Sequence, residues 1–172
     1  MALIKTIKNK KPVFGENCFF AENSTLVGEV IMGDNCTVWF NAVVRGDVHS
    51  ITIGNDTNIQ DGAIIHCTYQ KAKTVIGNKV SIAHNAIVHG CTVHDNVLIG
   101  MGAIIMDDAV VETGAVIAAG AVVLPGTRVE ANSIYAGVPA KKVKSTGPEM
   151  LEVIERTARN YPMYAQWYKE EG

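Results

Sequence analysis

Long apolar runs and an excess of basic charge are both missing from this sequence of 172 residues. No stretch approaches the roughly 20 apolar residues of a membrane-spanning helix, and residues 1–14 lack the apolar core of a secretory leader. Fifteen Lys and Arg residues against 17 Asp and Glu residues give a net charge of −2, which disfavours nucleic acid and anionic membranes as partners. We therefore expect a cytoplasmic protein that binds neither.

Cysteine is also used sparingly, and no two of the four cysteines have the CxxC spacing of a redox or zinc motif. Without a secretory signal, a disulfide framework is not expected. We predict that the four cysteines are reduced: Cys18, Cys36, Cys67 and Cys91. A chain that is 48% hydrophobic and only 19% charged can bury a sizeable core within a single domain.

The sequence does contain a six-residue repeat, and internal repeats decide the fold when they are present. Units open with an aliphatic or aromatic residue from Phe14 to Val129, with extra residues before Ile53 and a short loop over residues 70–74. The fifth position of each unit is small or valine, except at Tyr69 beside the loop. Gly, Asn and Asp crowd the positions between, where tight corners need left-handed backbone.

Each unit is expected to form one short strand and one corner, so that three units make one triangular coil. Coils stack about 4.8 Å apart, with the first residue of each unit pointing into the prism. We predict a single domain over residues 1–172, with an all-β solenoid over 14–143 and an N-terminal segment over 1–13 that covers the open end or adds an outer strand. A C-terminal helix is predicted over 146–171, with Pro162 kinking or interrupting it.

Three histidines stand out because of their place in the repeat. His66 and His89 both occupy the second position of the third unit, in successive coils, so their side chains lie in register about 4.8 Å apart. Two imidazoles at that separation can bind one metal ion. His84 lies outside this column, so as a third ligand it would come from a neighbouring subunit, which favours a trimer. The geometry alone leaves ordinary surface histidines as an equally good interpretation.

Several segments together resemble the γ-class carbonic anhydrase family, in particular its shorter bacterial members without acidic loops. These segments are NAVVRGD (41–47), TNIQD (57–61), IIH (64–66), IAHNAIVHGC (82–91) and VLIGMGAIIMD (97–107). The resemblance implies a left-handed parallel β-helix and a homotrimer. It also implies a Zn²⁺ ion, or alternatively Fe²⁺ or Co²⁺, bound by His66, His84 and His89, with His84 from the adjacent subunit. The implied reaction is reversible hydration of carbon dioxide to bicarbonate by a zinc-bound hydroxide.

The same resemblance assigns roles to further residues. Gln60 corresponds to a glutamine that hydrogen-bonds the metal-bound solvent, and Tyr161 to a tyrosine of the C-terminal helix near the metal. The remaining polar residues correspond to a charged pair at the subunit interface and to supporting residues around the site: Arg45, Asp47, Asn58 and Asp61.

The sequence departs from the family prototype around the site. Val48 replaces a glutamate, and the short basic loop CTYQKAKT (67–74) replaces an acidic loop with a proton-shuttling glutamate. His49 is a candidate substitute, although a surface turn is the plainer interpretation. Rival functions are a hexapeptide-repeat acyltransferase, whose common ending resembles YAGVPAKKV (135–143), an acyl-CoA thioesterase, and a non-catalytic metal-stabilised trimer. A mixed site that includes Cys67 or Cys91 is a further alternative to inert solenoid cysteines.

Overall fold

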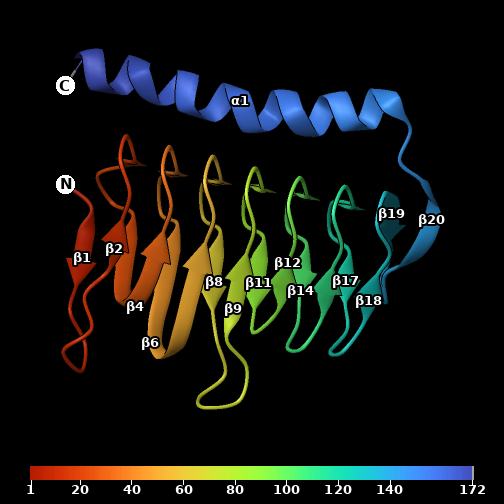
Figure 1. Ribbon diagram of the computed structural model, residues 1–172, viewed down its shortest axis with the longest axis horizontal. Coiled ribbons are helices and arrows are strands. Elements are labelled where there is room, and N and C mark those ends of the chain that lie inside the picture. Colours follow the sequence, from red (N-terminus) through yellow and green to blue (C-terminus); the bar gives the residue numbers. More distant parts are fainter. Residues whose placement is uncertain (172) are drawn as a thin grey trace.

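In the computed structural model, which describes residues 1–171, the chain forms a parallel β-helix with one long helix along its side (Figure 1). Short strands stack in parallel on three faces, and each strand pairs with its counterparts one coil earlier and one coil later. The predicted all-β solenoid, a left-handed parallel β-helix of hexapeptide repeats with a C-terminal helix, is confirmed.

The strands fall into three faces of the prism. The first face holds β1 (Leu3–Lys5), the first parts of β4 (Thr25–Met32) and β6 (Val43–Ile53), β8 (Ile64–His66), β11 (Ile87–His89), β14 (Ile104–Ile105) and β17 (Val122–Val123). The second holds β2 (Val13–Phe14), the later parts of β4 and β6, β9 (Thr74–Ile76), β12 (Thr92–Val93), β15 (Val110–Val111) and β18 (Arg128–Val129). The third holds β3 (Phe19–Phe20), β5 (Thr37–Val38), β7 (Asn58–Ile59), β10 (Ser81–Ile82), β13 (Leu98–Ile99), β16 (Val116–Ile117), β19 (Ser133–Ala136) and the antiparallel β20 (Lys141–Ser145).

The core is a column of side chains from the first position of each unit, as the repeat predicts. On the third face, Ile59, Ile82, Ile99 and Ile117 stack in successive coils, and all four are fully buried. Small side chains at the fifth position are buried in the corners beside them: Ala42, Ala63, Ala86, Ala103, Ala109, Ala115 and Ala121. Burial of these residues along the whole prism fixes the register of every strand.

The strands β4 and β6 both bend around the corner between the first and second faces without a break. Their backbones approach closely there, because a Cβ atom on Gly46 would lie 2.5 Å from the carbonyl oxygen of Glu29. A Cβ atom on Gly28, whose φ is +75°, would lie 2.3 Å from the carbonyl oxygen of Gly46. Any larger residue would clash with backbone, so glycine is required at the corner that carries Arg45 and Asp47.

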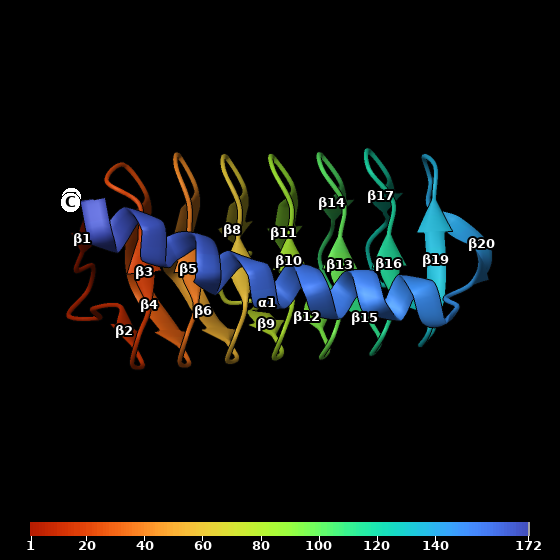
Figure 2. The ribbon, with the colours of Figure 1, turned by 90° about the horizontal axis from the view of Figure 1, so that it is seen from above.

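The helix α1 (Pro148–Glu171) runs back along the third face, over strands from β19 to β3 (Figure 2). It begins with a proline, which lacks only an N–H that a first helical turn leaves unpaired. On the side of α1 that faces the prism, its residues Ile154, Ala158 and Ala165 are buried. Of the two predicted effects of Pro162, a kink or an interruption, the interruption is wrong: α1 continues through Pro162, because packing on both sides of it outweighs the single hydrogen bond that it removes.

The N-terminal segment adds a strand to one end of the prism. β1 pairs in parallel with β4, with Leu3 opposite Thr25, and so extends the first face beyond the first coil. The side chains of β1 remain exposed. Within the described residues, no helix combines the length and the apolarity that crossing a bilayer requires.

Candidate metal centre

The parallel pairing of β8 with β11 places His66 directly opposite His89. Both residues end their strands at the corner between the first and second faces. The Nδ1 atom of His66 lies 3.1 Å from the Nε2 atom of His89, and the ring centroids are 5.1 Å apart. The register that the six-residue repeat predicts for these two histidines is therefore confirmed, and it brings two ring nitrogens face to face.

A carboxylate holds the outer nitrogen of each ring. His66 Nε2 lies 3.2 Å from Asp47 Oδ1, and His89 Nδ1 lies 2.6 Å from Asp107 Oδ1. Because an ionised carboxylate only accepts hydrogen bonds, each ring must use its N–H for that contact. The inner nitrogens of the neutral rings are then both acceptors. Metal-binding histidines in proteins have this arrangement, in which a carboxylate fixes the tautomer and orients the ring.

Both carboxylates are themselves anchored. Arg45 Nη1 donates to Asp47 Oδ2 over 2.6 Å, and the hydroxyl of Thr68 donates to Asp107 Oδ2. Burial alone would raise the pKa of Asp47, but the hydrogen bonds from Arg45 and His66 hold this pKa below its ordinary value. The pKa of Asp107 is lowered in the same way, since Thr68 and His89 outweigh burial. Both groups are thus kept ionised, as partners of metal-binding histidines need to be.

The paired rings fit a metal ion better than they fit one another. Two acceptor nitrogens 3.1 Å apart repel unless a proton or a cation lies between them. Burial lowers the pKa of His66, which disfavours the extra proton. Two nitrogens bound to one tetrahedral zinc ion at the usual bond length would be about 3.3 Å apart, close to the observed separation. The two facing nitrogens of His66 and His89 could therefore bind one metal ion together.

His84 lies at a different corner, between the third and first faces, where it follows β10. Its Nδ1 atom is 2.9 Å from Asp61 Oδ2, so a carboxylate orients this ring too. The side chain is 42% exposed. No three His, Cys, Asp or Glu side chains within the described part of the chain converge in metal-binding geometry. A single subunit thus carries a histidine pair on one corner and the remaining histidine on the next.

A buried amide chain runs beside the His84 corner. Asn58 Nδ2 donates to Ser81 Oγ over 2.8 Å, and Gln60 Nε2 donates to Asn58 Oδ1 over 3.0 Å. Asn58 and Gln60 are almost completely buried. Because the amide N–H of Gln60 donates to Asn58, its carbonyl oxygen is left as the group that can accept a hydrogen bond. This orientation suits the predicted contact of Gln60 with the hydrogen of a solvent molecule.

Tyr161 reaches the same corner from α1. Its ring meets Trp39 at a centroid distance of 5.5 Å, and it lines a hollow together with Asp61. Burial, followed by the nearby charge of Asp61, raises the pKa of Tyr161 to about 12. The hydroxyl therefore stays protonated at neutral pH. The structure thus gathers the predicted site residues into two groups: Arg45, Asp47, His66 and His89 at one corner, and Asn58, Gln60, Asp61, His84 and Tyr161 at the other.

Two residues of the histidine corner were not predicted from the sequence, Asp107 and Thr68. Asp107 holds the third position of its unit, where Asp and Asn elsewhere make corners: Asp34 and Asn55, for example, accept hydrogen bonds from the backbone of the preceding coil. Asp107 follows Met106, the counterpart of His89 one coil further on, and only this place beside the histidine column distinguishes it from those corner residues. Thr68 gave no signal, because nothing in the six-residue spacing distinguishes it from other polar residues near the corners.

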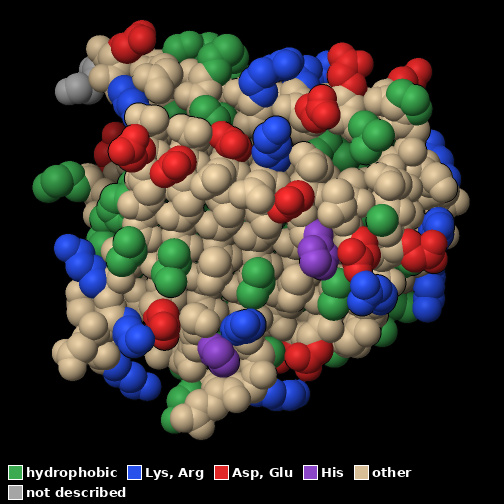
Figure 3. Space-filling view, viewed as in Figure 1, with side chains coloured by type: hydrophobic (Ala, Val, Ile, Leu, Met, Phe, Trp, Pro, Cys, Tyr) green, Lys and Arg blue, Asp and Glu red, His purple; other side chains and the backbone are tan. Residues whose placement is uncertain are grey.

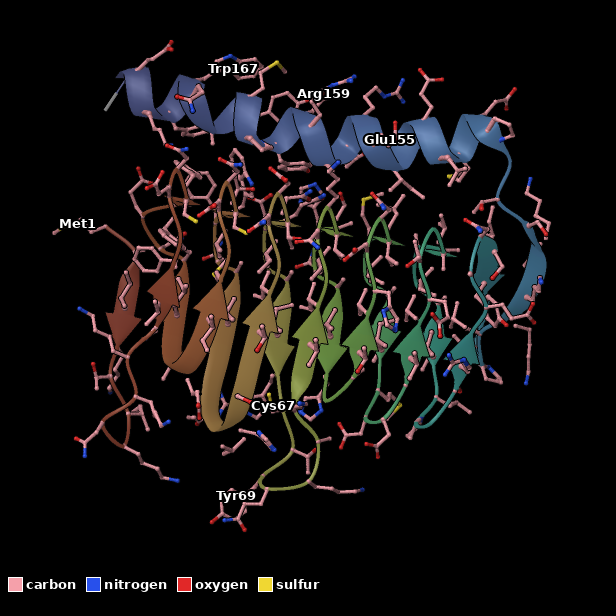
Figure 4. All side chains as sticks on the ribbon, in the orientation of Figure 1. Met1, Cys67, Tyr69, Glu155, Arg159 and Trp167 are labelled. Carbon is pink, nitrogen blue, oxygen red and sulfur yellow. The ribbon has the colours of Figure 1, made fainter. Side chains whose placement is uncertain are left out.

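The cysteines and His49 play no part in the histidine corners. Cys67 lies at the base of the loop between β8 and β9, whose tip carries Tyr69 (Figure 4), and Cys91 is buried in the core. Burial raises the pKa of both thiols, to about 12 for Cys91, and the thiol of Cys67 donates to the carbonyl oxygen of Ser50. All four cysteines are free within the described chain. His49 Nδ1 accepts a hydrogen bond from Ser50 N over 2.8 Å, which occupies the lone pair that a proton carrier needs.

The negative charge of Asp107, which orients His89, can be removed with little change of shape. Replacing Asp107→Asn should weaken metal affinity about 10-fold or more, because the amide lacks the charge that makes the imidazole a stronger ligand. Competition with a chromophoric chelator measures this affinity. Asp108→Asn is the matched control. Asp108 is the next residue along the chain, it is exposed, and its φ of +60° is one that asparagine tolerates. Equal metal affinities of the two variants would contradict the role of Asp107.

Comparison with known proteins bears on this geometry. Residues 11–46 and 90–125 match a family model described as bacterial transferase hexapeptide (six repeats). A protein of Methanocaldococcus jannaschii named "Probable carbonic anhydrase" is 49% identical over 149 residues, which cover 87% of this chain and 93% of that protein. The carbonic anhydrase of Geobacillus kaustophilus is 40% identical over 167 residues, which cover 97% and 91%.

Longer relatives and a solved structure extend the comparison. The mitochondrial γ carbonic anhydrases 1 and 2 of Arabidopsis thaliana are 35% identical, and the chain spans 63% of their length. The crystal structure of a hexapeptide transferase family protein from Anaplasma phagocytophilum is 36% identical, with a TM-score of 0.92 over 96% of this chain and 98% of that one. The chain belongs to the γ-class carbonic anhydrase family of hexapeptide-repeat proteins.

Proposed function

We propose that this protein catalyses the reversible hydration of carbon dioxide to bicarbonate at a Zn²⁺ ion held between the subunits of a homotrimer. The observation that carries the proposal is the pair of inward-facing nitrogens of His66 and His89, 3.1 Å apart, each backed by a carboxylate. His84, on the next corner and also backed by a carboxylate, would complete the site from an adjacent subunit. Fe²⁺ and Co²⁺ suit the same imidazole ligands.

When bound, the zinc ion would act as a Lewis acid and lower the pKa of a coordinated water toward about 7. The residues of the chain position the reactants around it. Asp47 and Asp107 keep the two histidine rings in the tautomers that leave the inner nitrogens unprotonated. Gln60 would orient the O–H bond of a solvent molecule with its carbonyl oxygen, because its amide N–H donates to Asn58, which in turn donates to Ser81.

Hydration also releases one proton for each bicarbonate formed. Val48 and the basic loop over 67–74 supply no carboxylate that could carry it, and the Nδ1 lone pair of His49 is held by Ser50. We therefore assign proton removal to the buffer. At a fixed pH, turnover is expected to rise with the concentration of a buffer such as imidazole and then to level off.

An acyltransferase function is less well supported. Acyl transfer on this fold needs a histidine with a free nitrogen that can act as a general base. The free nitrogens of His66 and His89 instead face each other, and each ring is tied to its own carboxylate. A comparison of carbon dioxide hydration with acyl-CoA hydrolysis and transfer, on the same metal-loaded sample, separates these functions. Acyl-CoA turnover without carbon dioxide hydration would overturn the proposal.

Mixed trimers test whether the site is shared between subunits. His84→Ala chains keep the pair His66 and His89, whereas His89→Ala chains keep His84. Co-expression with two different affinity tags and tandem purification isolates trimers that contain both chains. In a ring of three, one of the three interfaces then has a complete set of ligands, so about one third of the wild-type zinc content and activity should return. Each variant alone should have neither.

The same experiment has a clear negative outcome. If each site belonged to a single chain, every chain in the mixed trimer would lack one ligand, and neither zinc nor activity would return. Trimers of the doubly substituted chain, His84→Ala with His89→Ala, mixed with a singly substituted chain provide the matched control. If the pair and His84 come from different subunits, a mixture with either singly substituted chain cannot contain a complete set of ligands.

A further inference from the structure

Beside the His84 corner, aromatic side chains of α1 and of the third-face corners enclose a hollow of about 260 Å³. We call this hollow the aromatic pocket and define it by the residues that line it: Trp39, Phe40, Asp61, Tyr161, Tyr164, Trp167 and Tyr168. Hydrophobic side chains gather over the same C-terminal part of α1 in the space-filling view (Figure 3). The aromatic pocket concentrates aromatic residues that make up only 6% of the sequence.

The rings form an arc around the aromatic pocket. Trp39 stands at its centre, with Tyr161 on one side at 5.5 Å and Tyr168 on the other at 5.4 Å, both nearly perpendicular to it. The arc continues from Tyr161 to Tyr164 at 5.6 Å and from there to Trp167 at 5.1 Å. On the other side it continues from Tyr168 to Phe40 at 5.7 Å. Six rings thus follow one another in contact around the hollow.

Core packing does not account for the outer rings of the arc. Trp167 and Tyr168 are 55% and 46% exposed, although both are large and apolar. Trp167 extends from the last turns of α1 (Figure 4). Within one subunit, these two large rings are left exposed beside the hollow and are available to contact a ligand there.

The charge of the aromatic pocket selects the class of ligand. Asp61 is the one charged residue among those that line it, and it is negative. Its charge also contributes, after burial, to the raised pKa of Tyr161. Ring faces carry negative potential and attract cations, most strongly at tryptophan. Lys169, the nearest lysine in sequence, lies against the carbonyl oxygen of Asn17 at 3.5 Å instead of filling the hollow.

We propose that the aromatic pocket binds a small organic ammonium cation, with the methyl or methylene groups on the charged nitrogen held against the rings of Tyr161, Tyr164 and Trp167. The hollow has room for a quaternary ammonium head group, and the carboxylate of Asp61 supplies the counter-charge. Both features are those of aromatic cages that recognise quaternary ammonium groups. The proposal goes beyond the reaction proposed above, since all the residues that line the aromatic pocket come from one subunit and none of them is a proposed metal ligand.

The aromatic pocket is nevertheless coupled to the candidate metal centre. Asp61 accepts the hydrogen bond of His84 and also faces the aromatic pocket, so an ammonium ion would share this carboxylate with the histidine. A bound cation would weaken the hold of Asp61 on the ring. The occupied aromatic pocket should therefore lower the metal affinity of the site while leaving the fold unchanged.

Tryptophan fluorescence reports directly on the aromatic pocket, because the sequence has two tryptophans and both of them line it. The full-length protein is titrated with choline, and its uncharged isostere 3,3-dimethylbutan-1-ol serves as the reference ligand. Choline should change the emission in a saturable way, with and without metal. The isostere should bind at least about fivefold more weakly, because it has the same shape without the charge.

Two variants locate the binding. Trp167→Ala should weaken choline binding about fivefold or more, and the remaining Trp39 still reports on it. Tyr69→Ala is the control, since Tyr69 is equally exposed but lies at the tip of the distant loop between β8 and β9. Circular dichroism verifies that both variants are folded. Should Trp167→Ala fail to fold, Tyr164→Ala removes another ring of the same arc.

The proposal is overturned if choline gives no saturable response, or if the isostere binds as tightly as choline. It is also overturned if Tyr69→Ala weakens choline binding as much as Trp167→Ala does. Because binding is measured on metal-free protein as well, these results are independent of whether the protein hydrates carbon dioxide.

Discussion

The variant His89→Ala is expected to lose both the bound metal ion and carbon dioxide hydration, the latter by more than about 100-fold. His89 supplies one of the two inward nitrogens at the corner between the first and second faces, and its removal leaves His66 as the only ligand of that corner. A site with two histidines, from two different subunits, binds zinc far more weakly than a site with three. Metal content by elemental analysis and stopped-flow hydration assays measure the two losses.

A matched histidine variant separates this effect from a general one. His94 lies in an exposed corner of the next unit, with its Nε2 atom 3.7 Å from Glu112. His94→Ala should keep full metal content and activity. Because His89 is partly buried, His89→Ala could also destabilise the protein. His89→Asn keeps a polar group near Asp107 and is therefore made as a second, milder variant. Retention of one metal ion per chain in either His89 variant would show that His89 is not a ligand.

The histidine pair could be predicted from sequence because a solenoid turns spacing into position. Counting in sixes placed His66 and His89 in one column, and the parallel register of β8 and β11 pairs these two residues. The counting could not reveal that Asp47 and Asp107 anchor the rings, since this depends on side-chain directions at a corner. Nor could it give the orientation of the amide of Gln60, which follows from the buried contact between Asn58 and Ser81.

The repeat also predicted more of the prism than of its surroundings. Burial of the first position in every unit follows from the period, and so do the left-handed corners, where Asn35, Asp56 and Asn96 have φ near +55°. The helix is a different matter. Local chemistry alone predicts that a proline ends a helix. The helix α1 continues through Pro162 because it packs against the third face on both sides of that residue. Tertiary packing of this kind has no signature in a six-residue period.

A core substitution in the middle of the prism should have the second large effect, this time on stability. Ile99 opens its unit in β13, is fully buried, and stacks between Ile82 and Ile117. Ile99→Ala should destabilise the protein by about 2–5 kcal/mol, because three carbon atoms leave a close-packed column that can relax only slightly. Ile99→Val, which removes one methylene group, should cost about 0.5–1.5 kcal/mol. Denaturant unfolding at one fixed protein concentration measures both changes.

The location of Ile99 makes this a test of the solenoid itself. The exposed Ile31 on β4 serves as the control, and Ile31→Thr should change stability by less than about 0.5 kcal/mol. In a stack where each coil contacts only its neighbours, a cavity at a central coil weakens two interfaces at once. A cost below about 1 kcal/mol for Ile99→Ala would mean that the column does not hold the coils together. The register that brings His66 and His89 face to face would then need another explanation.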